Sequence, residues 1–67
     1  MLVFSMKKYL EDIGGVFDGG LDREWAEGCD GQEVVERNGS PLYHCKGKYT
    51  GFTYDIHRDW TEEVRVP

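Results

Sequence analysis

The fold of this chain is decided by residues 33–44, which read EVVERNGSPLYH. Asn38 and Gly39 separate two β-forming runs, and an Asn-Gly pair favours the positive φ angles of a type I′ turn in a two-residue hairpin. Pro41 lacks an amide hydrogen, so we expect it at the strand start with its nitrogen facing outward. The predicted register pairs Val35 with Leu42, Val34 with Tyr43, and Glu33 with His44.

Downstream of the hairpin the sequence keeps an extended, alternating pattern. Residues 46–48 predict the next turn, and residues 57–59 predict a polar turn further on. One face of a third strand is predicted to carry Thr50, Phe52, Tyr54 and Ile56, with Tyr49, Thr53, Asp55 and His57 on the other face. A final strand is predicted from the alternating set Trp60, Glu62, Val64 and Val66.

Upstream of the hairpin the pattern becomes helical. Apolar residues at helical spacing predict a first helix, namely Met6, Tyr9, Leu10 and Ile13. Ser5 is expected to cap it, Phe4 to pack on Tyr9 as a hydrophobic staple, and the glycines at 14–15 to end it. Alternatively, residues 2–4 form a short edge strand ahead of this helix.

Residues 21–27 predict a short second helix after the glycine-rich connection 16–20. Leu21 and Trp25 would share a face, and Gly28 would end the helix. Because so short a helix is marginal in water, Trp25 must dock on the core. The sequence therefore predicts an α+β fold with two short N-terminal helices packed on a three- to four-stranded antiparallel β-meander.

Length and composition favour one small domain, residues 1–67, that is 39% hydrophobic and carries nine aromatic residues. No apolar run reaches the roughly 18–20 residues of a membrane span. Residues 1–4 are too short for the apolar part of a signal peptide. We expect a soluble, cytoplasmic protein with no membrane partner.

The net charge of −5 is distributed unevenly along the chain. Residues 11–36 carry −8, residues 37–58 carry +3, and the two ends carry +2 and −2. In size and charge the chain resembles, in a generic way, the small acidic proteins of phages and mobile elements that inhibit nucleic-acid machinery, including anti-CRISPR proteins and DNA mimics. No sequence motif carries this resemblance.

That resemblance implies a non-catalytic inhibitor that occupies a basic surface of a nucleic-acid-binding partner protein. The alternative without a binding role is an acidic surface that only aids solubility. Aromatic anchors such as Phe17 and Trp25 would complete the interface. The expected partner-binding residues are Glu11, Asp12, Asp18, Asp22, Glu24, Trp25 and Glu27.

A second hypothesis is a sheet face that binds a peptide or a single nucleic-acid strand through Tyr43, Tyr49 and His57. The low pI of about 4.8 disfavours direct nucleic-acid binding, although Lys46, Lys48, Arg58 and Arg37 could form one basic edge.

A third hypothesis is a small metal-stabilised module using Cys29, His44, Cys45 and His57. The spacing disfavours zinc, because His44 and Cys45 are adjacent on a strand and therefore point to opposite faces. We therefore predict no metal and no other cofactor. No enzyme is predicted either, because a domain of this size has little room for a catalytic pocket. Cys29 and Cys45 permit one disulfide, but reduced thiols are expected in the cytoplasm.

Overall fold

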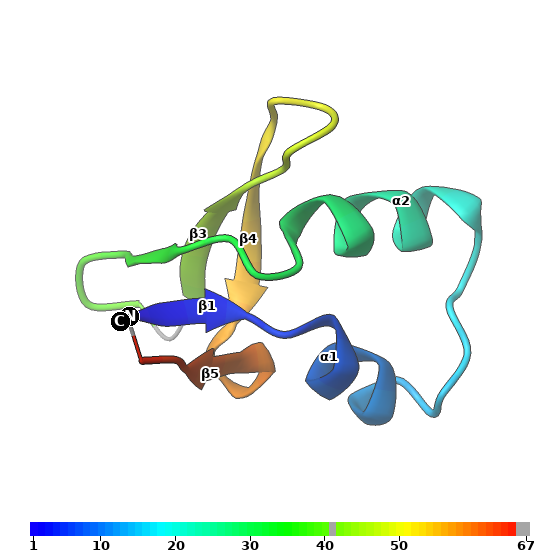
Figure 1. The fold of residues 1–67 in the computed structure, drawn as a ribbon, viewed down its shortest axis with the longest axis horizontal. Helices are drawn as coiled ribbons and strands as arrows, with labels where there is room; N and C mark the ends of the chain where they lie inside the picture. Colours follow the sequence, from blue (N-terminus) through cyan, green and yellow to red (C-terminus); the bar gives the residue numbers. More distant parts are fainter. Residues whose placement is uncertain (41, 66–67) are drawn as a thin grey trace.

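The computed structural model describes residues 1–40 and 42–65 and confirms the α+β class (Figure 1). Its elements follow the order β1 (Leu2–Phe4), α1 (Met6–Asp12), α2 (Gly20–Cys29), β2 (Val34–Glu36), β3 (Leu42–Lys46), β4 (Thr53–His57), a 3-10 turn η1 (Arg58–Trp60) and β5 (Thr61–Glu63). The alternative edge strand at residues 2–4 is therefore present as β1. Val66 and Pro41 lie outside the described residues, and with them the predicted orientation of Pro41.

The strands form two antiparallel sheets, β1-β5 and β2-β3-β4. The two sheets meet where β1 pairs with the residues ahead of β2, through a bridge between Val3 and Glu33. The Phe4 amide also donates to the Gln32 carbonyl at 3.1 Å, and the Gly31 amide donates to the Phe4 carbonyl at 2.9 Å. The meander thus has three strands, and the final strand pairs with β1 near the N-terminus instead of extending the meander.

The predicted hairpin register was wrong by two residues. Val34 pairs with Cys45, and Val35 pairs with His44. The cause lies in the turn, where the Ser40 amide donates to the Arg37 carbonyl at 3.0 Å. No described non-glycine residue has a positive φ, so Asn38 does not adopt the conformation that a type I′ turn requires. A shift of two residues keeps each side chain on its face, so the buried positions are preserved.

Helix α1 begins and ends through local interactions that the sequence predicted. The Ser5 hydroxyl accepts from the Lys8 amide at 3.3 Å, and the Phe4 and Tyr9 rings lie 6.1 Å apart between centroids. At the other end Gly14 and Gly15 have φ values of 94° and 86°. Their amides donate to the carbonyls of Glu11 and Leu10, which is the paired hydrogen bonding of a Schellman motif.

Helix α2 continues past the residue that was expected to end it. Gly28 lies inside the helix, and its carbonyl accepts from the Lys48 amide at 2.9 Å. A Cβ at Gly28 would lie 3.4 Å from Tyr49 Cδ2, so this glycine permits a close approach of the β3–β4 loop. That loop runs over residues 47–52 and is longer than the predicted turn at 46–48.

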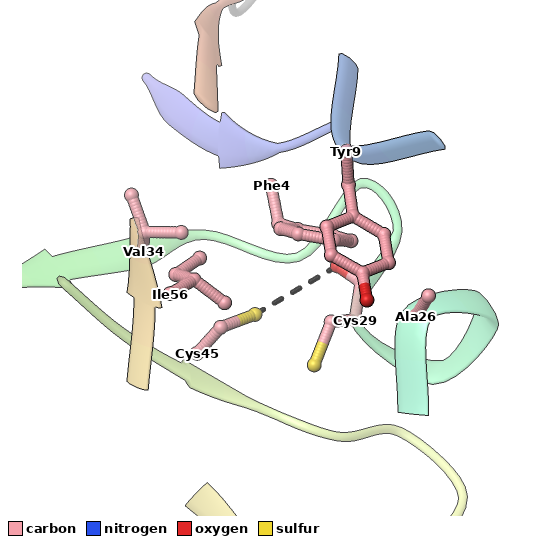
Figure 2. Packing of buried hydrophobic residues seen from close by; sticks show 7 residues of the cluster. All are labelled: Phe4, Tyr9, Ala26, Cys29, Val34, Cys45 and Ile56. Atoms are coloured by element: carbon pink, nitrogen blue, oxygen red, sulfur yellow. Dashed lines mark hydrogen bonds between the residues drawn. The ribbon is translucent and has the colours of Figure 1, made fainter. Parts of the chain in front are cut away.

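The core lies between the two sheets and the helices (Figure 2). Its buried residues are Phe4, Tyr9, Ala26, Cys29, Val34, Cys45 and Ile56. Trp25 docks against it as predicted, with its ring centroid 4.9 Å from that of Tyr9 and 5.4 Å from that of Phe4. Large aromatic rings therefore supply much of the contact area that so short a chain needs.

Candidate functional site

The carboxylate of Asp22 links helices α1 and α2 through hydrogen bonds. It accepts hydrogen bonds from the Tyr9 hydroxyl of α1 and, at 2.7 Å, from the Trp25 indole. Its second oxygen accepts from the Asp18 amide at 3.3 Å, just ahead of α2. Asp22 also stands in the first turn of α2, where the positive end of the helix dipole favours a negative charge.

This arrangement changes the acidity of both partners. Burial, followed by the hydrogen bond to Asp22 and the charges of Asp22 and Asp18, raises the pKa of Tyr9 to about 12. Partial burial alone would raise the pKa of Asp22, but the hydrogen bonds from Tyr9, the Asp18 amide and Trp25 together lower it. The Asp22 carboxylate is therefore ionised at neutral pH and hydrogen-bonded within the molecule.

Two grooves flank the first turn of α2. Groove 1 has a volume of about 620 Å³ and lies between the end of α1 and the start of α2. Groove 2 has a volume of about 330 Å³ and lies between α2 and the β3–β4 loop. Groove 1 is lined by Tyr9, Ile13, Val16, Asp18, Gly19, Gly20, Leu21 and Asp22, and groove 2 by Leu21, Glu24, Trp25, Thr50, Phe52 and Tyr54.

Leu21 lines both grooves and, at 83%, is the most exposed large apolar residue within residues 1–40 and 42–65. Val16 of groove 1 is 76% exposed and Phe52 of groove 2 is 69% exposed. We call the two grooves with these three side chains the Leu21 surface. A concentration of exposed apolar side chains beside acidic residues is typical of an interaction site.

The structure separates the seven expected partner-binding residues into three groups. Asp18 and Glu24 are exposed at the grooves, while Asp22 and Trp25 line them but use their polar atoms inside the molecule. Three others line neither groove: Glu11 is exposed on α1, Asp12 accepts from the Trp60 indole at 2.9 Å, and Glu27 is paired with Arg23 at 2.8 Å.

Leu21, Val16 and Phe52 were not among the residues expected to bind a partner. Phe52 was placed in the third strand, but β4 begins at Thr53 and leaves it in the loop. The missed signal for Leu21 is the spacing Asp22, Trp25, Ala26 and Cys29, because these residues form the inward stripe of α2. Leu21 lies beside that stripe and is left exposed.

The residues of the sheet-face hypothesis do not gather on one face. Tyr43 pairs with the buried Ile56 and packs against the core, whereas Tyr49 lies in the β3–β4 loop and is 66% exposed. His57 pairs with Leu42 at the neighbouring register position, and its Nδ1 accepts from the Asp59 amide at 3.2 Å.

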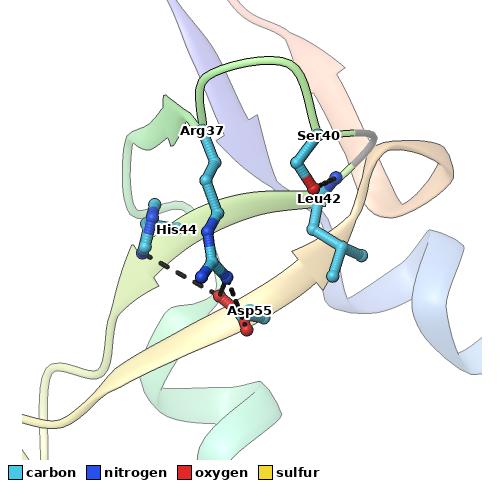
Figure 3. Close-up of polar contacts among 5 residues, drawn as sticks. All are labelled: Arg37, Ser40, Leu42, His44 and Asp55. Carbon is cyan, nitrogen blue, oxygen red and sulfur yellow. Dashed lines mark hydrogen bonds and ion pairs between the residues drawn. The ribbon is translucent and has the colours of Figure 1, made fainter.

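The outer face of the β2-β3-β4 sheet carries a polar cluster (Figure 3). Nη1 of Arg37 lies 3.0 Å from each oxygen of Asp55, and Nδ1 of His44 lies 3.9 Å from one of them. Arg37 therefore neutralises the Asp55 charge, and this part of the predicted basic edge is already paired within the molecule.

The cysteines and histidines lie in different environments. Cys29 and Cys45 are free thiols in the core, where the Cys45 Sγ lies 3.7 Å from the Cys29 carbonyl oxygen (Figure 2). Contact with Cys45, together with burial, raises the pKa of Cys29. Across residues 1–40 and 42–65, His, Cys, Asp and Glu side chains form no group of three that could hold a metal ion.

Within the same residues, none of the helices has the length and apolar character that a membrane crossing requires. Comparison with known proteins adds no relative: no family model, no curated protein and no solved structure matches this chain. Function must therefore be inferred from the Leu21 surface itself.

Proposed function

We propose that this chain is a non-catalytic protein-binding domain that docks through the Leu21 surface on a basic surface of its partner. The observation that carries the proposal is the position of Leu21, which is 83% exposed and lines both grooves. Burying a leucine side chain stabilises a complex by up to about 1.5–3 kcal/mol, and the grooves give partner side chains a place on either side.

Charge supports a basic partner. Asp18 and Glu24 stand exposed at the two grooves, and Asp22 adds a third negative charge between them. The segment that contains this surface, residues 11–36, has a net charge of −8. Such a field attracts a positively charged partner and speeds its association at low salt.

The inhibitor role implied by the chain's generic resemblance is a narrower form of this proposal. In that form the partner binds nucleic acid, and the Leu21 surface covers the basic region that nucleic acid would otherwise occupy. Support comes from the acidic residues near α2, although Asp12, Asp22 and Glu27 already have partners inside the molecule. The apolar contacts around Leu21 must then supply much of the affinity.

The test begins with a photo-reactive amino acid placed at Val16, with the same substitution at Val35 as the matched control. Both valines are exposed, at 76% and 60%, but Val35 lies on the outer face of the β2-β3-β4 sheet. We expect cross-linking of one protein from position 16 and not from position 35.

The cross-linked protein is then purified and titrated with Leu21→Ser and Val35→Ser variants at two salt concentrations. We expect Leu21→Ser to lower the affinity about tenfold or more, Val35→Ser to leave it unchanged, and added salt to weaken binding of the wild type. Equal cross-linking from both positions, or an unchanged affinity of Leu21→Ser, would refute the proposal. Competition by added DNA tests the narrower inhibitor role.

A further inference from the structure

Groove 2 is lined mainly by aromatic and aliphatic side chains. Three of its residues are aromatic, Trp25, Phe52 and Tyr54, and Leu21 adds an aliphatic wall. The rings of Trp25 and Tyr54 are stacked at 5.7 Å between centroids with an interplanar angle of 29°. This stacking fixes both rings, so the groove presents a preformed aromatic floor.

Most polar atoms of groove 2 are already bonded within the molecule. The Trp25 indole donates to Asp22 at 2.7 Å, and the Tyr54 hydroxyl shares a hydrogen bond with the Thr50 hydroxyl at 2.9 Å. The Thr50 hydroxyl also accepts from the Phe52 amide at 3.2 Å. A ligand in this groove therefore meets ring surfaces and finds few free hydrogen-bonding groups.

The Glu24 carboxylate differs from the other polar groups of groove 2. Among the described residues it takes part in no ion pair, whereas Glu27, one turn further along α2, is paired with Arg23. Glu24 lines groove 2 and remains exposed. The groove thus combines an aromatic floor with one uncommitted negative charge.

We infer that groove 2 is the anchor site for an arginine side chain of the partner protein, an inference that rests on the proposed function and specifies its chemistry. The guanidinium group is planar and weakly hydrated, stacks on aromatic rings, and matches a carboxylate with two parallel hydrogen bonds. The aliphatic part of the arginine would lie along Leu21 and Phe52. A lysine ammonium fits less well, because it is strongly hydrated and the groove offers a single charged acceptor.

The inference is tested by NMR titration of the isotope-labelled domain with N-acetyl-arginine amide. N-acetyl-citrulline amide is the isosteric uncharged control, and N-acetyl-leucine amide tests a purely apolar occupant. We expect the arginine probe to shift the Trp25 indole signal and the amides of Leu21 and Phe52. We also expect it to bind about fivefold to tenfold more tightly than either control, which is the combined strength of an exposed cation–π contact and an ion pair.

A matched pair of variants assigns the effect to one carboxylate. Glu24→Gln should remove the ion pair but keep the cation–π contact, and so lower the affinity for the arginine probe about twofold to threefold, part of the way toward that of the citrulline probe. Glu27→Gln on the same helix should leave the affinity unchanged. Equal or tighter binding of the leucine probe, shifts outside groove 2, no shifts at all, or full binding by Glu24→Gln would each overturn the inference. This titration uses the isolated domain without a partner protein, so a negative result does not decide the outcome of the cross-linking test of the proposed function. A negative cross-linking result likewise does not decide whether groove 2 binds the arginine probe.

Discussion

Asp22 and Glu24 are acidic residues two positions apart on α2, and their surroundings differ sharply. Asp22 accepts three hydrogen bonds, from Tyr9, Trp25 and the Asp18 amide, and so joins α1 to α2. Glu24 is exposed at groove 2 and takes part in no ion pair within residues 1–40 and 42–65. Acidic residues of one segment therefore differ in their structural roles: the Asp22 carboxylate links the two helices, whereas the Glu24 carboxylate is exposed at groove 2.

The largest effect is expected when each carboxylate is removed in turn. Asp22→Ala should lower the free energy of unfolding by about 2–3 kcal/mol, because it leaves the Tyr9 and Trp25 donors without their charged acceptor. Glu24→Ala should change it by less than about 0.5 kcal/mol, as is usual for an exposed side chain. Urea unfolding followed by tryptophan fluorescence measures both. Similar losses in the two variants would remove the distinction between the two residues.

A slightly smaller effect is expected at Gly47, which lies against Tyr54 and Thr50 of groove 2. A Cβ there would lie 2.8 Å from Tyr54 Cε2 and 2.9 Å from the Thr50 hydroxyl oxygen. Gly47→Ala should therefore destabilise the protein by about 1–3 kcal/mol through overpacking.

The matched control is Gly20→Ala in the first turn of α2, where a new Cβ would meet nothing within 4 Å. This substitution should be neutral or stabilise the helix by up to about 1 kcal/mol. Thermal unfolding of the two variants gives the comparison, and a stable Gly47→Ala protein would show that the β3–β4 loop can move away from Tyr54.

The hydrogen bond between Tyr9 and Asp22 should also make stability depend on pH at both extremes. The pKa of Asp22 is lowered in the folded state, so its contribution is present above the ordinary pKa and is lost as pH falls through the folded value. The pKa of Tyr9 is raised to about 12, so its contribution is present below its ordinary pKa of 10.0 and is lost as pH rises from there toward 12.

Urea unfolding across the pH range checks both directions. Asp22→Asn should flatten the acid side of the stability profile, and Tyr9→Phe should flatten the alkaline side. A wild-type profile that neither variant alters would mean that the pair is not coupled to folding.

Local interactions explain why α1 could be predicted in detail. Its cap at Ser5, its staple between Phe4 and Tyr9 and its glycine end all involve residues within a few positions of one another. The β1–β5 pairing could not be read in the same way, because it joins residues about 60 positions apart, such as Leu2 and Glu63. The hairpin register failed for a third reason, since the actual turn gives a positive φ to Gly39 but not to Asn38.

The candidate site was predicted only in part. The acidic segment that the charge pattern singled out contains Val16 and Leu21 of the Leu21 surface, and the expected docking of Trp25 on the core is confirmed. Sequence alone could not show that Asp22 bonds to Tyr9, which lies 13 positions away on another helix. It also could not show that the β3–β4 loop would approach α2 closely enough to form groove 2 beside Leu21.

The most direct test of the Leu21 surface as the binding site compares binding and stability in the same variant, Leu21→Ser. The protein cross-linked from position 16 is titrated with this variant and with wild type, and both are unfolded in urea. We expect the affinity to fall about tenfold or more while the free energy of unfolding changes by less than about 0.5 kcal/mol. Unchanged affinity, or a loss of affinity that merely follows a loss of folding, would contradict the assignment of the Leu21 surface as the binding site.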